Sequence, residues 1–277
     1  MSSQTPKISV IMPFYNAAAF LAPALESILN QTFRDFELIL INDASTDNSD
    51  QIVQRYLTDQ RIIYIKNKVN QGIVFNLNLA LQRAQSEIIA RMDGDDVCEP
   101  DRFAKQYEFL QQHPEVAAVG SFIKIIDENG KIIDQRTKPV DFEQMKKKLL
   151  VYSPVVHASL LYRKSAVLAL GGYRDKYLYC EDIDLFYRLV YSGHILANIP
   201  EFLYYYRYHH DSVAHRSKLL AKKMLLLRHE TITSFSLKVP RKQWLMIYLQ
   251  YFIGIGLSGR QRQMFEGWYK KIFYHGK

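Results

Sequence analysis

Cysteine is scarce in this sequence: among 277 residues only Cys98 and Cys180 occur. Two cysteines form neither a disulfide framework nor the closely spaced set that a structural metal site needs, so both are expected to be small core side chains. The chain also starts without a basic segment followed by an apolar one, as a secretory signal would require. Both absences favour a cytoplasmic protein.

Long hydrophobic runs are missing as well. Residues 244–257 form an apolar stretch whose 14 residues, interrupted by Gln250, fall short of the ~20 needed to cross a bilayer. Basic residues flank this stretch, and the aromatic and basic residues of 265–274 follow it. Interfacial helices mix aromatics with cations in this way. Residues 216–277 are therefore predicted to be helical, and either to dock on the anionic cytoplasmic leaflet of a membrane or to cap the fold with a solvated basic face.

Excess charge of one sign is missing from most of the chain. The formal net charge is +8, but residues 216–277 hold 13 basic and 2 acidic residues, whereas residues 1–215 hold 23 and 26. The basic character therefore belongs to the C-terminal region and concerns what that region touches. A hydrophobic fraction of 48% and a charged fraction of 23% are typical of a folded protein with a sizeable core.

Strand-like apolar runs alternate with helical apolar stripes over the first hundred residues. Pro13 is expected to stop the first run, because proline lacks the N–H group that a strand uses. Such alternation predicts right-handed βαβ crossovers, a parallel sheet and a ligand site at the carboxyl ends of its strands. The polar turns at those ends favour a nucleotide pocket. The runs are residues 8–12, 36–41, 62–65 and 88–92, and the turns start at Pro13, Asp43, Asn70 and Asp93.

Further elements are predicted beyond residue 100. Residues 116–126 are expected to form a strand that enters a hairpin turn at 128–130. Residues 183–192 are expected to form a helix with an inward apolar stripe. Two separate apolar runs follow, 195–199 and 202–206.

Three carboxylates crowd the turn Asp93-Gly94-Asp95-Asp96, at the end of a buried apolar run. Side chains alternate along a strand and lose that alternation in a turn, so Asp93 and Asp95 are expected to face one small volume. Packed acids repel one another, and Mg²⁺ or Mn²⁺ bound by one or two carboxylates completes its shell with phosphate oxygens and water. The turn predicts a metal and diphosphate site. The alternative is a solvated acidic turn in which Gly94 supplies a positive φ.

Seven motifs together resemble the family 2 glycosyltransferases of the GT-A fold, over about residues 6–215. The resemblance implies an α/β domain with a Rossmann-like, mainly parallel sheet flanked by helices, in which residues 1–100 bind the nucleotide and residues 101–215 form the acceptor half. The helical basic region 216–277 follows this domain, 1–215. The motifs are Pro13-Phe14-Tyr15-Asn16, Asn42-Asp43-Ala44-Ser45-Thr46-Asp47, Asn70-Gln71-Gly72, Asn78, Asp93-Gly94-Asp95-Asp96, Gly171-Gly172-Tyr173 and Glu181-Asp182.

The resemblance implies an inverting transferase that moves a sugar from a nucleotide donor, commonly a UDP-sugar, to an acceptor hydroxyl with Mn²⁺ or Mg²⁺. By position, Pro13 and Tyr15 would line the base pocket, with Asn16 of the same motif beside the nucleotide. Asp43 would accept the imide hydrogen of uracil, because a carboxylate offers only acceptors and pairs with a donor on the base edge. The alternative for Asp43 is a helix N-cap or an Asx-turn residue.

Two further positions resemble the family's residues beside the nucleotide, namely Gly72 and Asn78. Asn78 is also explained as a residue that fixes a loop through backbone hydrogen bonds. Asn42 departs from the family pattern, which usually shows a second aspartate there. This departure alters a hydrogen bond and leaves Asp43 intact.

In the acidic turn the family pattern assigns Asp93 to the ribose or to metal-bound water, Asp95 to the metal and Asp96 to the neighbourhood of the donor sugar. A one-residue ambiguity keeps Asp93 as a further metal ligand. The implied ion would stabilise negative charge as the nucleoside diphosphate departs. His209 resembles a family histidine near the diphosphate, where it either binds the metal or donates to phosphate; the alternative is a surface histidine.

Asp182 is the predicted catalytic base and Glu181 is predicted to orient it. Inversion in one displacement needs a group on the acceptor side that takes the hydroxyl proton, and a positioned carboxylate can do so. The dipole of the helix that starts there favours the anion of Asp182. The alternative is a merely acidic first turn. His157 and Gly172 resemble acceptor-side residues, and His157 is otherwise a satisfied loop histidine.

The predicted function is nonprocessive transfer of one sugar to a cell-surface glycan or its lipid-linked precursor, at the cytoplasmic face of the membrane. Processive synthases of the family carry a Gln-x-x-Arg-Trp segment and several membrane helices, and neither occurs here. One alternative is transfer to a polyprenyl phosphate, an anion that needs no base, which Glu181-Asp182 argues against. Another is a basic nucleic-acid-binding protein, which would need a basic groove with stacking aromatics; no nucleic-acid partner is expected.

Overall fold

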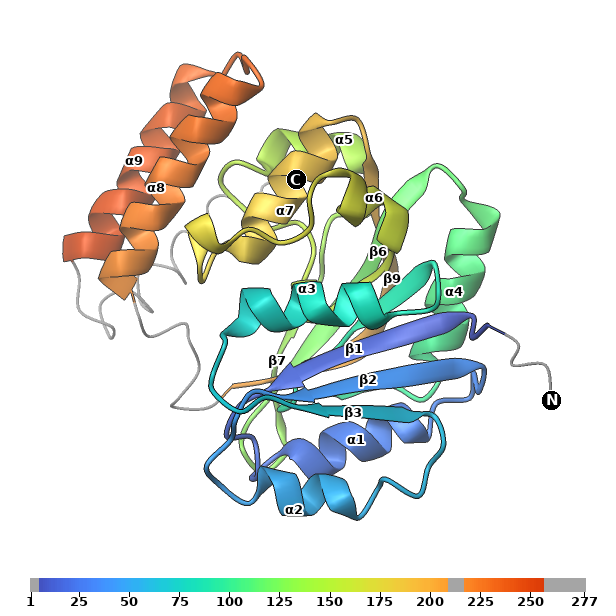
Figure 1. Cartoon of the computed structure of the whole chain (residues 1–277). Coiled ribbons are helices and arrows are strands. Elements are labelled where there is room, and N and C mark those ends of the chain that lie inside the picture. The colour runs from blue at the N-terminus through green and yellow to red at the C-terminus, as the bar shows by residue number, and fades with distance from the viewer. Residues whose placement is uncertain (1–4, 209–216, 257–277) are drawn as a thin grey trace.

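The computed structural model describes residues 5–208 and 217–256 (Figure 1). Within this part of the chain the strands join in one nine-stranded sheet, and helices cover both of its faces. The predicted α/β class is therefore confirmed. His209, the assumed boundary at 215 and the aromatic residues of 265–274 lie outside the described residues.

The N-terminal half builds a parallel sheet in the order β3-β2-β1-β4. Its strands are fully buried apart from β3 at the edge, as expected of a parallel sheet covered on both faces. Its connections are helices, so the predicted βαβ units are confirmed. The elements are β1 (Ile8–Phe14), α1 (Leu21–Leu29), β2 (Phe36–Asn42), α2 (Ser49–Gln54), β3 (Ile62–Lys66), α3 (Ile73–Arg83) and β4 (Ile88–Arg91).

Pro13 does not stop β1, so that expectation was wrong. The strand continues to Phe14, and Pro13 pairs with Ile41 of β2. The Ile11 carbonyl accepts from the Met92 N–H just after β4, whereas the Phe14 carbonyl accepts from the Asp43 N–H just after β2. Backbone groups alternate along a strand, so the nitrogen of Pro13 faces the β4 side. The pairing of β1 with β4 ends at Ile11, and the missing N–H of Pro13 therefore costs no ladder hydrogen bond.

The second half extends the same sheet from β4 in the order β8-β6-β9-β5, with β7 beside β6. Most of these joins are antiparallel; only β6 and β9 run parallel. The elements are β5 (Val97–Cys98), α4 (Arg102–Gln112), β6 (Val116–Ile126), β7 (Ile132–Arg136), α5 (Phe142–Lys148), a 3₁₀ turn (His157–Ser159), β8 (Leu161–Arg163), α6 (Lys164–Ala169), a 3₁₀ turn (Asp175–Tyr177), α7 (Glu181–Tyr191) and β9 (Ile195–Arg207).

The two apolar runs at 195–199 and 202–206 belong to one long strand, β9. Ser121 pairs with Ile199 and Phe122 with Phe202, so Pro200 and Glu201 are extra residues in a bulge. A bulge accommodates a proline because the extra residues leave the ladder, and this joins runs that the sequence separates.

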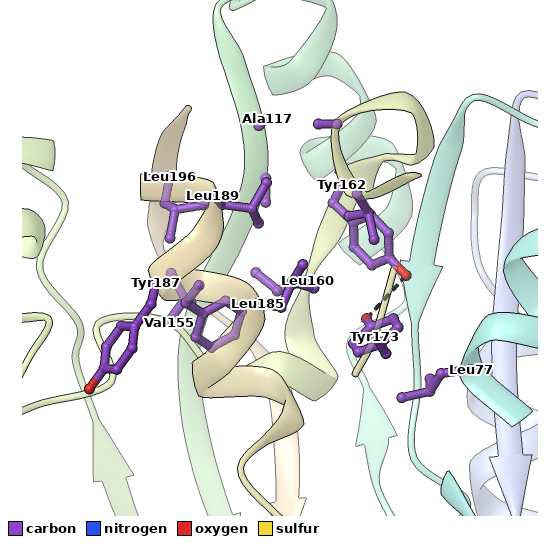
Figure 2. Packing of buried hydrophobic residues seen from close by; sticks show 14 of the residues in the cluster. Leu77, Ala117, Val155, Leu160, Tyr162, Tyr173, Leu185, Tyr187, Leu189 and Leu196 are labelled. Carbon is purple, nitrogen blue, oxygen red and sulfur yellow. Dashed lines mark hydrogen bonds between the residues drawn. The ribbon is translucent and has the colours of Figure 1, made fainter. Parts of the chain in front are cut away.

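Two apolar clusters lie on opposite faces of the sheet. On one face α1 and α4 pack through residues such as Leu25 and Phe103. On the other face α3 and α7 pack through Leu77 and Leu185, and Figure 2 shows this second cluster at close range. The helices thus cover the faces, and the polar turns at the carboxyl ends of the strands are left for a site.

Two C-terminal helices, α8 (Ser217–Ser234) and α9 (Arg241–Gly256), lie side by side next to α7 (Figure 1). Leu227 and Ile247 are fully buried in the cluster that contains α7. Gln250 donates to the Val151 carbonyl at 2.9 Å, which ties α9 to the main sheet domain. Across residues 5–208 and 217–256, helices of the length and apolarity that a bilayer crossing demands do not occur.

Candidate functional site

The acidic turn after β4 gathers its carboxylates as predicted. One oxygen from each of Asp93, Asp95 and Asp96 lies within 4.8 Å of the others. Asp96 is buried and accepts hydrogen bonds from the Tyr204 hydroxyl at 2.9 Å and from the Arg207 N–H at 2.7 Å. The turn between β4 and β5 is thereby fixed against β9.

The electrostatics of this cluster fit a divalent cation. Burial raises the pKa of the Asp96 carboxyl well above its usual range, and the charges of Asp95 and Asp93 raise it further. Oxygen ligands at this spacing suit a hard ion such as Mn²⁺ or Mg²⁺, which would offset the mutual repulsion of the acids. The donor set therefore fits the metal that the sequence predicts.

Gly94 is not in the left-handed backbone region, so the interpretation that it supplies a positive φ was wrong. A Cβ built on Gly94 would lie 2.9 Å from the Phe14 Cβ and 3.4 Å from the Ala17 Cβ. Glycine is needed because the acidic turn packs closely against the end of β1 and the segment that follows it.

Asp43 lies at the carboxyl end of β2 and is almost fully buried. Its carboxylate accepts from the Gln71 and Gly72 N–H groups at 2.8 and 2.9 Å and from the Asn67 amide at 2.8 Å. Asp43 therefore holds the loop that leads into α3. It caps no helix of its own, because α2 begins after Asn48, so the N-cap alternative was wrong.

The turns after β1 and β2 hold each other in place. Asn16 accepts from the Thr46 N–H at 2.8 Å, and its own N–H donates to the Ser45 hydroxyl at 3.0 Å. Tyr15 beside them is 50% exposed, so an aromatic face is left for a ligand. Pro13 is buried in β1 beneath this turn.

A hollow of about 410 Å³ adjoins these turns, and Asn67, a hydrogen-bond partner of Asp43, belongs to its wall. The size is within the range of small-molecule sites. Its wall contains two lysines, of which Lys66 pairs with Asp50. The lining residues are Ala44, Ser45, Lys66, Asn67 and Lys68.

Asn78 joins α3 to the loop before α7. Its amide donates to the Tyr173 carbonyl and accepts from the Tyr173 N–H, both at 2.9 Å. The backbone of Gly172 lies so close that a Cβ there would be 2.6 Å from the Asn78 oxygen. Of the two interpretations of Asn78, the loop-fixing hydrogen bonds are the ones observed.

Glu181 and Asp182 open α7, as predicted. Burial, followed by the charge of Asp182, raises the pKa of Glu181 to about 7, and Glu181 Oε2 is buried without a hydrogen-bond partner. Burial also raises the pKa of Asp182, whose carboxylate accepts from the Ile183 N–H at 2.8 Å. Two partly buried carboxylates with raised pKa values are typical of sites that exchange protons.

His157 contacts the same region. Its Nε2 lies 2.8 Å from the Tyr173 hydroxyl, and burial together with the nearby charge of Arg91 lowers the pKa of the imidazole well below its usual range. A neutral imidazole can accept from or donate to that hydroxyl. His157 is therefore joined to the loop that Asn78 fixes.

Sequence reasoning missed Arg91, the last residue of β4. Its side chain is 6% exposed and forms an ion pair with Asp93. The available signal was a charged residue that ends a buried apolar run, which calls for a partner because a buried charge is costly alone.

Comparisons with known proteins agree with this geometry. The sequence model of the family described as "Glycosyl transferase family 2" matches residues 9–171. The chain is 36% identical over 250 residues to the putative glycosyltransferase EpsE of Bacillus subtilis (strain 168), with 87% of each chain covered. It is 32% identical over 213 residues to the amylovoran biosynthesis glycosyltransferase AmsE of Erwinia amylovora, covering 75% of this chain and 79% of AmsE.

Two solved structures share the fold. S. aureus TarS 1-349 in complex with UDP-GlcNAc superimposes with a TM-score of 0.66 at 21% identity, over 90% of this chain and 81% of that one. The mannosyltransferase PcManGT from Pyrobaculum calidifontis, in complex with GDP-Man and Mn²⁺, gives a TM-score of 0.63 at 17% identity, over 98% and 82%. At these identities the likeness concerns the fold.

Proposed function

The chain belongs to glycosyl transferase family 2 and is a glycosyltransferase, and from this premise we propose that it moves one sugar from a UDP-sugar to a hydroxyl of a glycan or of its lipid-linked precursor, with inversion and with a divalent metal. The observation that carries the proposal is the meeting of the Asp93, Asp95 and Asp96 oxygens within 4.8 Å at the carboxyl edge of the sheet. Ligands bind at this edge in open α/β folds.

The uridine preference is supported by Asp43 and its surroundings. Its carboxylate is positioned by the loop after β3 beside the 410 Å³ hollow, where an acceptor group would meet a donor on the base edge. Tyr15 offers an exposed ring for stacking. TarS binds UDP and UDP-GlcNAc on the same fold, which supports this choice, while PcManGT binds GDP-Man and makes the guanosine donor the outcome to exclude.

The metal proposal assigns Asp95 and Asp93 as ligands, with Asp96 fixed behind them by β9. When bound, the ion supplies Lewis-acid stabilisation of the departing diphosphate. His209 lies outside the described residues, and its role near the diphosphate stays a proposal. The residues on the acceptor side are Glu181 and Asp182. We assign Asp182 as the base because it lies in the first turn of α7 with its carboxylate held by the Ile183 N–H.

Membrane attachment at the cytoplasmic face is proposed from α8 and α9. Lys218, Lys222 and Leu226 are exposed at four-residue spacing on α8, and Leu226 is 64% exposed. On α9 the corresponding stripe contains Leu245 and Phe252, 69% and 61% exposed. Cations beside exposed apolar side chains suit the surface of an anionic bilayer, which would hold the site near a lipid-linked acceptor.

The function is tested by a screen of UDP-, GDP- and dTDP-sugars with Mn²⁺, with the released nucleotide measured. We expect UDP release from the wild type, and no turnover or metal-dependent UDP binding from Asp95→Asn, because the charge that holds the ion is removed. Asp182→Asn should bind UDP normally and lose roughly 10²-fold or more in transfer, the usual scale for a general base.

The matched control is Asp134→Asn, since Asp134 is an exposed carboxylate on β7. It should leave binding and turnover unchanged. Release of GDP alone would overturn the uridine assignment, full Mn²⁺-stimulated binding by Asp95→Asn would overturn the metal assignment, and near-normal transfer by Asp182→Asn would place the base elsewhere.

A further inference from the structure

Arg91 is held in a fixed place at the edge of the metal site. It ends β4, its N–H donates to the Leu160 carbonyl at 2.9 Å, and its carbonyl accepts from Arg102 at 2.9 Å. The side chain is 6% exposed and its guanidinium contacts the Asp93 carboxylate as an ion pair. Hydrogen bonds to the backbone N–H and carbonyl of Arg91, together with the ion pair, therefore fix the position of its charge.

The environment of the guanidinium is poor in neutral acceptors. Nε of Arg91 is buried without a hydrogen-bond partner, and Nη1 contacts the charged Asp93 carboxylate as an ion pair and not a neutral acceptor. Burying a cation without full hydrogen bonding is costly unless anions lie close by. Asp93 is in contact, and the charge of Arg91 also acts on Glu181 and Asp182 at the start of α7. Arg91 thus interacts electrostatically with both the metal-side and the acceptor-side carboxylates.

The ion pair changes what the acidic cluster can bind. Asp93 belongs to the group of three carboxylates and already contacts a cation. A bare divalent ion placed there would share Asp93 with Arg91, and the two cations would repel each other in a poorly solvated site. A diphosphate adds negative charge, which offsets that repulsion. The cluster is therefore better matched to metal and diphosphate together than to metal alone.

We infer that Arg91 couples the binding of the metal to that of the nucleotide, so that the site takes the divalent ion with the donor diphosphate and binds it weakly on its own. This inference rests on the proposed function, because it takes the Asp93 cluster as the metal and diphosphate site. Arg91 is a positioning residue in this scheme: it orients Asp93 and sets the charge of the site.

The test compares wild type with Arg91→Met and Arg91→Lys by calorimetric titration of Mn²⁺ alone, and of UDP at saturating Mn²⁺. Arg91→Met should bind Mn²⁺ alone about tenfold more tightly and UDP with Mn²⁺ about tenfold more weakly, since one nearby positive charge is removed. Arg91→Lys should stay close to wild type in both titrations, because it keeps the charge. A merely structural role would weaken both kinds of binding.

The control is Arg61→Met. Arg61 pairs with Asp59 before β3, at the edge of the sheet opposite the site, so its loss changes the net charge by the same amount and should change neither affinity. Arg91→Gln replaces the methionine variant if the latter does not fold, which circular dichroism would report. The inference is overturned if the neutral variant binds Mn²⁺ alone no better than wild type, or binds UDP with Mn²⁺ as well.

A failure of the proposed function would look different. In that case the wild type itself would bind no UDP in the presence of Mn²⁺, whatever residue stands at 91. If the wild type binds both together and the Arg91 variants do not differ from it, the function holds and only the coupling role of Arg91 is wrong.

Discussion

Glu181 and Asp182 show how burial sets the chemistry of single residues. A carboxyl group in water loses its proton well below neutral pH. Glu181 lies at the start of α7 with Oε2 buried and unpaired, and burial raises its pKa from the usual 4.5 to about 7. The proton is therefore bound more tightly in the folded protein than in the unfolded chain. The contribution of Glu181 to the free energy of unfolding is fully present below about pH 4.5 and is lost as the pH rises through about 7.

Glu181→Gln should remove this dependence. At pH 5 the amide resembles the protonated acid and stability should equal that of the wild type. At pH 8 the variant should be more stable by up to about 3 kcal/mol, since a shift of this size corresponds to that energy. Urea unfolding at both pH values measures the difference. Glu108→Gln, at an exposed carboxylate on α4, serves as control and should behave alike at both; a pH-independent effect of Glu181→Gln would contradict the argument.

At the scale of residues, the gathering of the acidic side chains was predicted from the sequence, but their ion-pair and hydrogen-bond partners were not. Asp93, Asp95 and Asp96 meet as expected, because strand geometry and a short turn leave them little choice. Arg91 could have been identified from the apolar run that it ends, whereas its ion pair with Asp93 is seen only in the structure. The hydrogen bonds of Asp96 to Tyr204 and Arg207 join residues more than a hundred positions apart, and no local pattern reports such a pairing.

At the scale of elements, the loop before α7 contains two adjacent glycines that are required for different reasons. Gly171 and Gly172 both have a positive φ, of 82° and 72°. A Cβ at Gly171 would meet nothing within 4 Å, whereas one at Gly172 would strike the Asn78 oxygen that accepts from Tyr173. Both positions need glycine for the backbone, but only Gly172 needs it for the contact with α3.

Gly172→Ala and Gly171→Ala therefore form a matched pair. Alanine in the left-handed region costs about 1–2 kcal/mol at either position. Gly172→Ala should cost at least about 1 kcal/mol more, because the Asn78 hydrogen bonds to Tyr173 are displaced. Urea unfolding compares the two, and UDP binding should persist in both. Equal losses of stability would show that the contact with Asn78 contributes little.

The order of elements was predictable where local rules dominate. Apolar periodicity and βαβ connections identified the strands from β1 to β4 and the helices between them. The antiparallel partners of the second half were not identified, because pairing of β8 with β4 and of β5 with β9 depends on contacts between distant segments. The bulge at Pro200 could not be predicted for the same reason. The two apolar runs form one strand because both pair with β6, which is distant in the sequence.

At the scale of the whole molecule, α8 and α9 add a surface of different character to the sheet domain. The two helices contact each other where the Tyr248 hydroxyl lies 3.3 Å from His229 Nε2. Glu230 is the single acidic residue between positions 217 and 256, and it pairs with Lys176 and Tyr177 on the main domain. Apart from Glu230, which is 33% exposed, no carboxylate between positions 217 and 256 opposes the exposed basic side chains of the helix pair.

Substitutions test this surface better than truncation does. Removal of α8 and α9 would uncover the apolar cluster in which Leu227 and Ile247 are buried. An exposed apolar core binds vesicles non-specifically, so a truncation would not test the surface of the helices. Leu226→Ser with Phe252→Ser removes two exposed apolar contacts, and Lys218→Glu with Lys222→Glu reverses two charges. The controls are Leu168→Ser on α6, 46% exposed, and Lys131→Glu beside β7.

Liposome flotation at two salt concentrations gives the readout. The wild type should float with anionic vesicles at low salt and much less with neutral ones, because each basic residue near the surface contributes about 1 kcal/mol and salt screens it. Each double variant should reduce flotation, since the apolar and the charged contacts act together, and the control variants should float as the wild type does. If both double variants float normally, or the wild type stays unbound at low salt, the helix pair serves to cap α7 and the acceptor reaches the site by another route.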